Sequence, residues 1–220
     1  MFHCYQFIKR LPNLELKDFQ RRWCDDQLSS AELSRVIRHI KSCRLDGEIV
    51  KDNSDGVNEF WVESLSDFFG VRAKFDAQAQ DLKGSRELIE HNRSEWLSTI
   101  DNVILDGALK TGQVKTVSRI RRKEGMSVEE FRDWWSVKHS EIACRLPGIE
   151  RYVQSATVDE AYFYGEPRWD GVAQIWVRDL PSLAAMRESE TYQVEAMNDA
   201  TRFLDLSAIS VFVAVEQEVC

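Results

Sequence analysis

The chain has 220 residues, of which 43% are hydrophobic and 30% are charged. Its 10 glycines and 4 prolines are too few for a disordered or collagen-like protein. No apolar run reaches the length of about 18 residues that a membrane-spanning helix needs. The net charge of −8 argues against a broad surface for nucleic acid or anionic lipid. We therefore expect a globular protein whose partners are small molecules or other proteins.

Five cysteines lie at irregular spacing without a CxxC motif: Cys4, Cys24, Cys43, Cys144 and Cys220. An odd number without motif spacing favours neither a disulfide framework nor a zinc site, so we expect reduced thiols and no metal. The amino terminus, MFHCYQFIKR, does not have the pattern of a secretory signal. The sequence thus predicts a cytoplasmic protein.

The predicted elements alternate between strands and helices in two similar series. In chain order, the strands lie at 4–10, 38–42 and 55–62, and then at 115–122, 149–158, 170–177 and 208–217. A helix follows the first strand of each series. In the second series, Ser127 with Glu130 three residues later predicts a capping box at the helix start. A further helix begins at about Pro181.

The two series are also similar residue by residue. YQFIKRLPNLELKDFQRRW, from Tyr5 to Trp23, aligns without a gap with VSRIRRKEGMSVEEFRDWW, from Val117 to Trp135. Two further pairs are RHIKS with RYVQS and DGVNEFWVESL with DGVAQIWVRDL. The order of the pairs is kept and their offset hardly changes, so chance similarity is a poor explanation. We infer a duplicated unit, with one copy at 1–110 and the other at 111–220.

Strand, helix, strand, strand, helix, strand is the ferredoxin-like order. The fold class is therefore α+β, with two tandem ferredoxin-like βαββαβ repeats. Each repeat leaves one face of its sheet without helices, and the two faces can cover each other in a pseudodimeric α+β barrel. Residues 69–92 have no gap-free counterpart in the second half, and we expect this insertion to form a lid or a subunit contact.

The segments EGMSVEEFRDWWSVKH, LPGIERYVQ and WDGVAQIWV resemble the EthD family of dimeric α+β barrel proteins over nearly all of residues 113–219. The first half resembles the same family more weakly. The resemblance implies a barrel of two fused halves. It also implies a relationship to cofactor-free cyclases, isomerases, decarboxylases and lyases that act on aromatic or polyketide-like compounds, and to some haem proteins.

The two halves differ where the family's motif has a histidine. His139 lies four residues after Trp135, whereas the matching position of the first half is Gln27. A histidine in one copy alone points to a single specialised site. The alternative is a structural histidine that caps carbonyl groups or packs against Trp135.

Strand alternation predicts a pocket on the helix-free faces, because neighbouring residues of a strand point to opposite sides. On the third strand of each half, Glu59 with Trp61 and Gln174 with Trp176 are expected to face the interior of the barrel. On the second strands, His39 with Lys41 and Tyr152 with Gln154 are expected to point the same way. The alternative is that the aromatic residues only pack the core.

These observations predict a cofactor-independent lyase or isomerase for a small aromatic or hydrophobic substrate. His139 or His39 would be the general acid–base, and Tyr152, Glu59 or Gln174 would orient the substrate or stabilise an enolate. The expected substrate-binding residues are Trp61, Trp176, Glu59, Gln174 and Trp135. The alternatives are a haem-binding barrel and a non-catalytic binding protein of a degradation pathway. We expect no cofactor, no nucleic acid and no membrane as partners, and leave a homodimer open.

Overall fold

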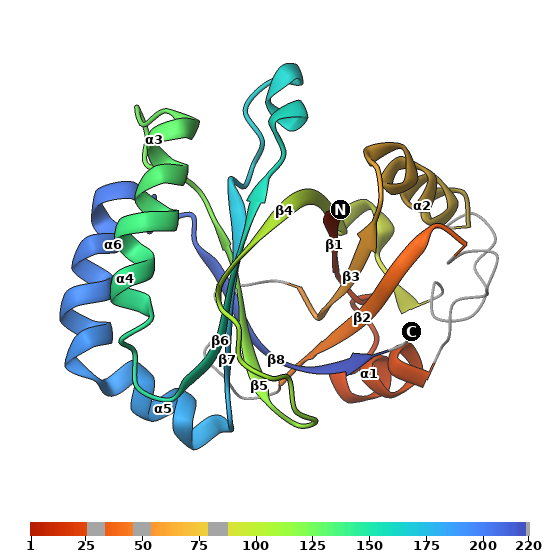
Figure 1. The fold of residues 1–220 in the computed structure, drawn as a ribbon. Helices are drawn as coiled ribbons and strands as arrows, with labels where there is room; N and C mark the ends of the chain where they lie inside the picture. The colour runs from red at the N-terminus through yellow and green to blue at the C-terminus, as the bar shows by residue number, and fades with distance from the viewer. Residues whose placement is uncertain (26–33, 46–53, 79–87, 219–220) are drawn as a thin grey trace. The chain divides into compact units, whose positions relative to one another are not determined.

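The computed structural model describes residues 1–25, 34–45, 54–78 and 88–218 (Figure 1). By their internal contacts these residues divide into two compact units. Unit 1 contains residues 1–25, 34–45, 54–78, 88–100 and 214–218, and unit 2 contains residues 101–213. The chain therefore enters unit 2 in the middle of one strand and leaves it in the middle of another.

Unit 1 is built on three antiparallel strands in which β3 is central. Its elements are β1 (Phe2–Ile8), α1 (Leu16–Asp25), β2 (Val36–Arg44), β3 (Gly56–Val62), α2 (Leu65–Gln78), a 3₁₀ turn η2 (His91–Arg93) and β4 (Glu95–Leu105), which continues into unit 2. Glu59 of β3 lies opposite Tyr5 of β1 on one side and Ile40 of β2 on the other. This register decides which side chains share a face of the sheet.

Unit 2 repeats this arrangement with β7 as the central strand. Its elements are β5 (Val114–Ile120), α3 (Val128–Asp133), η3 (Trp134–His139), α4 (Ser140–Ala143), β6 (Ile149–Thr157), η4 (Asp159–Tyr164), β7 (Gly171–Val177), α5 (Leu180–Glu188), η5 (Thr191–Ala196), α6 (Met197–Phe203) and β8 (Ser210–Glu218). Figure 1 shows helices α3 to α6 as a layer on one face of β5, β6 and β7. The hydrogen-bonded strand order, β1-β3-β2-β8-β5-β7-β6-β4, is that of a closed antiparallel barrel.

The predicted helix starts in unit 2 follow from side-chain capping. Ser127 accepts a hydrogen bond from the backbone of Glu130, whose carboxylate accepts one from the backbone of Ser127, so the predicted capping box is confirmed. The side chain of Asp179 caps the next helix by accepting a hydrogen bond from the backbone N–H of Ser182. Hydrogen bonds from the hydroxyl and the backbone of Ser182 lower the pKa of Asp179 to about 2. Both helices therefore begin where a short polar side chain satisfies an unpaired backbone N–H.

Each unit packs a tryptophan of its first helix against a glycine of its central strand. A Cβ atom on Gly56 would lie 2.7 Å from the ring of Trp23, and one on Gly171 would lie 2.8 Å from the ring of Trp135. Both tryptophans are buried, at 1% and 2% exposure. Only glycine lets the indole approach the strand this closely, and the helix-covered core of each unit forms around that contact.

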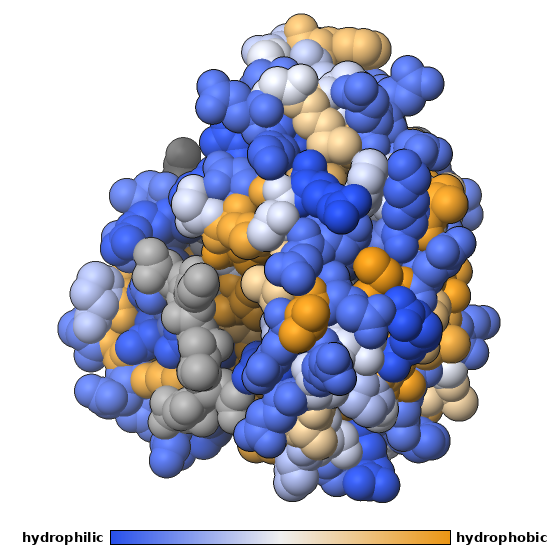
Figure 2. All heavy atoms as spheres, turned by 90° about the vertical axis from the view of Figure 1, so that its left-hand side faces the viewer, coloured by the Kyte–Doolittle hydropathy of each residue, from blue (hydrophilic) through white to orange (hydrophobic). Residues whose placement is uncertain are grey.

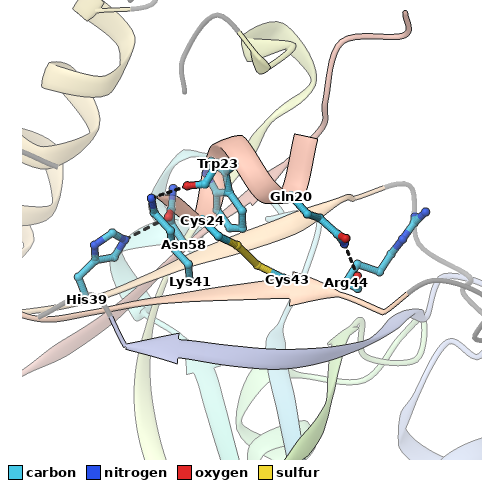
Figure 3. Close-up of a disulfide and its surroundings, with 8 residues drawn as sticks. All are labelled: Gln20, Trp23, Cys24, His39, Lys41, Cys43, Arg44 and Asn58. Carbon is cyan, nitrogen blue, oxygen red and sulfur yellow. Dashed lines mark hydrogen bonds between the residues drawn. A yellow bond between two sulfur atoms is a disulfide. The ribbon is translucent and has the colours of Figure 1, made fainter. Parts of the chain in front are cut away.

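The expectation of five reduced thiols is wrong for one pair. Cys24 at the end of α1 and Cys43 in β2 form a disulfide (Figure 3). The two residues are 19 apart in sequence, without a motif, and only the packing of α1 on β2 brings them together. Cys4 is buried and Cys144 is exposed, both as free thiols, and Cys220 lies outside the described residues. A cytoplasmic location, which rested partly on reduced thiols, stays a prediction.

Thiol titration checks this disulfide directly. Unfolded in denaturant without reductant, the chain is expected to expose three reactive thiols, because five cysteines less one disulfide leaves three. After reduction the count is expected to rise to five. A Cys24→Ser variant, which leaves Cys43 unpaired, is expected to give four under both conditions. A count of five in the unreduced wild-type chain would contradict the disulfide.

The segment predicted as a lid or subunit contact begins instead as an ordinary helix. Its first ten residues complete α2, whose Val71 and Phe75 are buried against Cys4 and Phe60 of the sheet. Residues 79–87 lie outside the described part of the chain. Among the described residues, no helix combines the length and the apolar character needed to cross a membrane.

Candidate active site in the helical layer of unit 2

His139 lies at the end of η3, a π-helical turn that interrupts the helix begun by α3. Its Nδ1 is 2.9 Å from Oδ2 of Asp199 in α6, and its ring packs 5.0 Å from that of Phe203. The other carboxylate oxygen of Asp199 accepts a hydrogen bond of 3.1 Å from Nε1 of Trp134. Wide π-helical turns occur often at functional sites. Here the turn places the side chains of Trp134 and His139 as donors to the carboxylate of Asp199, and these hydrogen bonds link η3 to α6.

The environment of His139 keeps its imidazole neutral near pH 7. Burial lowers the pKa of His139 from its ordinary value, and the hydrogen bond and charge of Asp199 only partly oppose this. Nδ1–H donates to Asp199, so the lone pair of the neutral ring is on Nε2. A histidine held in one tautomer by a carboxylate is the arrangement of a general base.

A pocket of about 400 Å³ lies beside this pair. It is lined by Ile142, Val194, Glu195, Asn198, Asp199 and Arg202. Figure 2 shows the side of the molecule that carries α3 to α6, where hydrophilic residues predominate and apolar residues form small separate patches. Val194 is 48% exposed at this surface. The pocket thus has a carboxylate shared with His139, two apolar side chains and several polar groups.

Sequence reasoning missed Asp199 and the rest of the pocket. Asp199 is 60 residues from His139 in the chain, and no motif connects them. A weaker signal was present, because Glu195, Asn198, Asp199 and Arg202 are spaced i, i+3, i+4 and i+7, which places them on one helical face. That pattern is typical of solvated helices as well, so it does not identify a site by itself.

On the two central strands, the predicted orientation is confirmed. Glu59 and Trp61 lie on the face of β3 opposite to Phe60, which packs in the core under α2. Gln174 and Trp176 lie on the face of β7 opposite to Ala173, which packs under the helices of unit 2. The small and apolar residues of these strands correctly marked the helix-covered side.

On the two second strands, the predicted orientation is wrong. His39 lies opposite Phe60, and Tyr152 lies opposite Ile175, so both point to the helix-covered face. The same holds for Lys41, whose Nζ donates 2.8 Å to the carbonyl of Trp23, and for Gln154, whose Nε2 donates 2.8 Å to that of Trp135. These polar groups bond the carbonyls of the overlying helices, a contact that an apolar-inside pattern cannot reveal.

The predicted catalytic and binding residues under the helices are well packed. Burial raises the pKa of Tyr152 to about 12, and its hydroxyl accepts from Nε1 of Trp135 at 3.1 Å and from Gln154 at 2.9 Å. Trp135 itself lies in the core with Phe131, 5.4 Å between ring centroids. His39 stacks on Phe60 at 4.5 Å. These contacts are those of a packed core, and a chemical role for His39, Tyr152 or Trp135 stays a prediction.

A second polar cluster lies in unit 1, on the face of its sheet opposite to the helix-covered core. Nδ1 of His3 is 3.0 Å from the hydroxyl of Tyr5, and its Nε2 is 3.4 Å from Glu59, which also accepts 2.6 Å from Ser42. The ring of His3 stacks on Trp61 at 3.9 Å. All but Trp61 are at most 1% exposed. The structure therefore brings Glu59 and Trp61 together with His3, not with His39.

The described residues contain no group of three or more His, Cys, Asp or Glu side chains arranged to hold a metal ion. The position that matches His139 in the first half, Gln27, lies outside the described residues.

Comparisons with known proteins support the family resemblance and the fold. The EthD domain model matches residues 123–207, which include His139 and Asp199. No curated protein matches the chain. An anthrone oxidase-like protein of known structure is 12% identical, with a TM-score of 0.63 over 99% of this chain and 92% of that chain. Chlorite dismutase from Candidatus Nitrospira defluvii, in complex with imidazole, is 11% identical, with a TM-score of 0.58 over 97% and 90%. At such identities these structures share the fold.

Proposed function

We propose that this chain is an enzyme that moves a proton on a small hydrophobic molecule, with His139 as its general acid–base. The reaction class is a lyase or an isomerase that needs no cofactor, and the substrate is an aromatic or polyketide-like compound. The observation that carries the proposal is the pair of His139 and Asp199 beside a pocket of about 400 Å³. The EthD match over the same residues supports it.

The proposed step begins with the neutral imidazole. Nε2 accepts a proton from a carbon next to a carbonyl group of the substrate, and the electron pair of the broken C–H bond moves into an enolate. Asp199, which holds Nδ1–H, stabilises the positive charge that the ring then carries. The imidazolium returns its proton to another carbon in an isomerisation, or to a leaving group in an elimination. His139 therefore takes up one proton and gives up one proton in each catalytic cycle.

The test is exchange of substrate hydrogens with solvent. Aromatic and polyketide-like ketones are incubated with the protein in deuterium oxide, and loss of C–H signals is followed by NMR. A His139→Gln variant can still donate an amide N–H to Asp199 but cannot accept a proton at neutral pH. We expect exchange to slow by about 10²–10⁴-fold, the usual contribution of a positioned acid–base group.

The matched control is His91→Gln, on the η2 turn of the other unit, which is expected to leave exchange unchanged. If His139 only links two helices, His139→Gln should lower thermal stability and leave the exchange rate of the folded protein intact, which would refute the proposal. A compound that binds and survives unchanged, with no exchange, would favour the non-catalytic binding protein.

Neither His39 nor the pocket beside Asp199 fits a haem, the other chemistry that the resemblance suggested. A porphyrin needs an axial ligand and broad apolar walls. His39 is completely buried against Phe60 and Asn58, and half of the residues that line the pocket beside Asp199 carry a charge. A Soret band on titration with haemin that disappears in the His139→Gln variant would contradict this.

We also propose that the chain arose by tandem duplication of one ferredoxin-like module. Arg10 donates to Asp55 and, through Nε, to the carbonyl of Leu14, 2.6 Å away. In the second unit Arg122 donates to Asp170 and, through Nε, to the carbonyl of Met126, 2.9 Å away. The shared network supports one ancestor, and it is independent of the helical layer in which only the second copy has His139.

A further inference from the structure

The polar groups at the wall of the unit 2 pocket differ in whether they already have partners. Glu195 is paired with Arg145, with 2.6 Å between oxygen and nitrogen. Asp199 accepts from Trp134 and His139. Both carboxylates are thus already engaged as acceptors within the protein, so their negative charges are partly offset by Arg145, His139 and Trp134.

Arg202 is different. Its guanidinium lies 5.9 Å from the centroid of the Trp134 ring, and within the described ranges no carboxylate comes within ion-pair distance of it. The side-chain amide of Asn198, one turn earlier on the same helix, likewise makes no hydrogen bond to a described residue. The charged group of this pocket without an ion-pair partner among the described residues is therefore a cation, and the Asn198 amide beside it can donate or accept a hydrogen bond. A planar guanidinium with its fork of N–H groups matches a carboxylate.

We propose that this pocket binds a small hydrophobic carboxylic acid, with its carboxylate on Arg202 and its apolar part against Ile142 and Val194. The inference rests on the proposed function and narrows its substrate class. Arg202 anchors the acid group while the carbon that loses its proton lies toward His139. Arg202 is then a specificity-determining residue rather than a proton carrier.

The experiment measures binding alone, so it does not depend on turnover. Benzoate is the probe, and benzamide, which has nearly the same shape without the charge, is its neutral counterpart. Binding is followed in ¹H–¹⁵N spectra through the indole N–H of Trp134, which donates to Asp199 in the pocket wall. A Trp134→Phe variant assigns that signal among the seven tryptophans.

We expect benzoate to shift the Trp134 signal in the wild-type protein and benzamide to shift it much less. Arg202→Gln is expected to raise the Kd of benzoate by at least about 10-fold, the usual loss for a hydrogen bond to a charged group. Arg202→Lys should restore part of the affinity. The matched control is Lys138→Gln, which removes a cation 4.0 Å from the same Trp134 ring but not one that lines the pocket. Its Kd is expected to change by less than about 3-fold.

Equal binding of benzoate and benzamide, an unchanged Kd in Arg202→Gln, or no shift at about 10 mM benzoate would overturn this inference. Unchanged spectra elsewhere show that each variant is folded. If benzoate binding fails these tests while His139→Gln still abolishes exchange, the proposed function stands and only the substrate class is wrong. If Arg202 binds benzoate and no compound exchanges, the pocket binds acids without the proposed chemistry.

Discussion

Replacing Asp170 by alanine is expected to lower the free energy of unfolding by about 3–5 kcal/mol. Asp170 is 1% exposed and accepts from the backbone of Arg122 at 2.7 Å, from its guanidinium, and from the hydroxyl of Tyr162 at 2.7 Å. Without the carboxylate, a largely buried guanidinium loses its main counter-charge, and two further donors lose their acceptor. Loss of one partner of a buried pair costs more than the pair itself contributes.

Urea unfolding at pH 7 measures this effect. The control is Asp159→Ala, which removes an ion pair with Arg132 in which the aspartate side chain is 72% exposed. An exposed pair of this kind contributes about 0–1 kcal/mol. The matching variant in the other unit, Asp55→Ala, is expected to cost as much as Asp170→Ala, since it leaves Arg10 in the same position. If Asp170→Ala and Asp55→Ala each lower the free energy of unfolding by less than about 1 kcal/mol, the two networks do not stabilise their units as proposed.

Lowering the pH from 6.5 to 4 is expected to destabilise the protein through His39 by about 3 kcal/mol. Burial lowers the pKa of His39 from 6.5 to about 4, and the charge of Lys41 acts in the same direction. The hydrogen bond to Asn58 and the charge of Glu59 oppose the shift without cancelling it. Nε2–H donates to Asn58 at 3.1 Å, whereas Nδ1 has no hydrogen-bond partner in the described part of the chain (Figure 3).

The sign follows from where the proton binds. Above pH 6.5 the ring is neutral in the folded and unfolded chains, so His39 contributes nothing to the pH dependence. Between pH 6.5 and 4 the unfolded chain takes up a proton that the folded chain does not, and stability therefore falls with pH.

The measurement compares the wild-type chain with His39→Gln, which keeps a donor toward Asn58 but does not titrate. Carboxylates titrate alike in both chains, so the difference between their stability curves isolates His39. Parallel curves from pH 7 to pH 4 would show that the folded chain accommodates the charged ring.

Residue patterns predicted the elements of this fold well where a local rule acts. Ser127 with Glu130 fixed a helix start because the capping box needs only four consecutive residues. The alternation of Ala173 with Gln174 assigned the faces of β7 because small residues fit under a helix. The recurrence of Phe131 and Trp135 at the positions of Phe19 and Trp23 revealed two similar units, and both pairs are buried.

The same reasoning failed where a polar side chain has a distant partner. Lys41 and Gln154 were predicted to face the barrel interior, yet each points to the helix-covered face, where the backbone carbonyl of a helix residue accepts its hydrogen bond. The assignment of His39 and Tyr152 was wrong for that reason, since they follow the alternation of those neighbours. The pairing of Cys24 with Cys43 likewise depends on how α1 packs on β2.

By itself, the sequence determined the order of the elements in the second half, the similarity of segments between the two halves, and the position of His139, which the first half matches with Gln27. These depend on side chains close together in the chain, whose spacing carries the information. Only the tertiary structure decided that His139 meets Asp199 rather than Tyr152 or His39, and that Arg202 forms no ion pair with any carboxylate in the part of the chain that the structure describes. Such contacts join residues tens of positions apart, and their distances are set by helix packing, which no local pattern encodes.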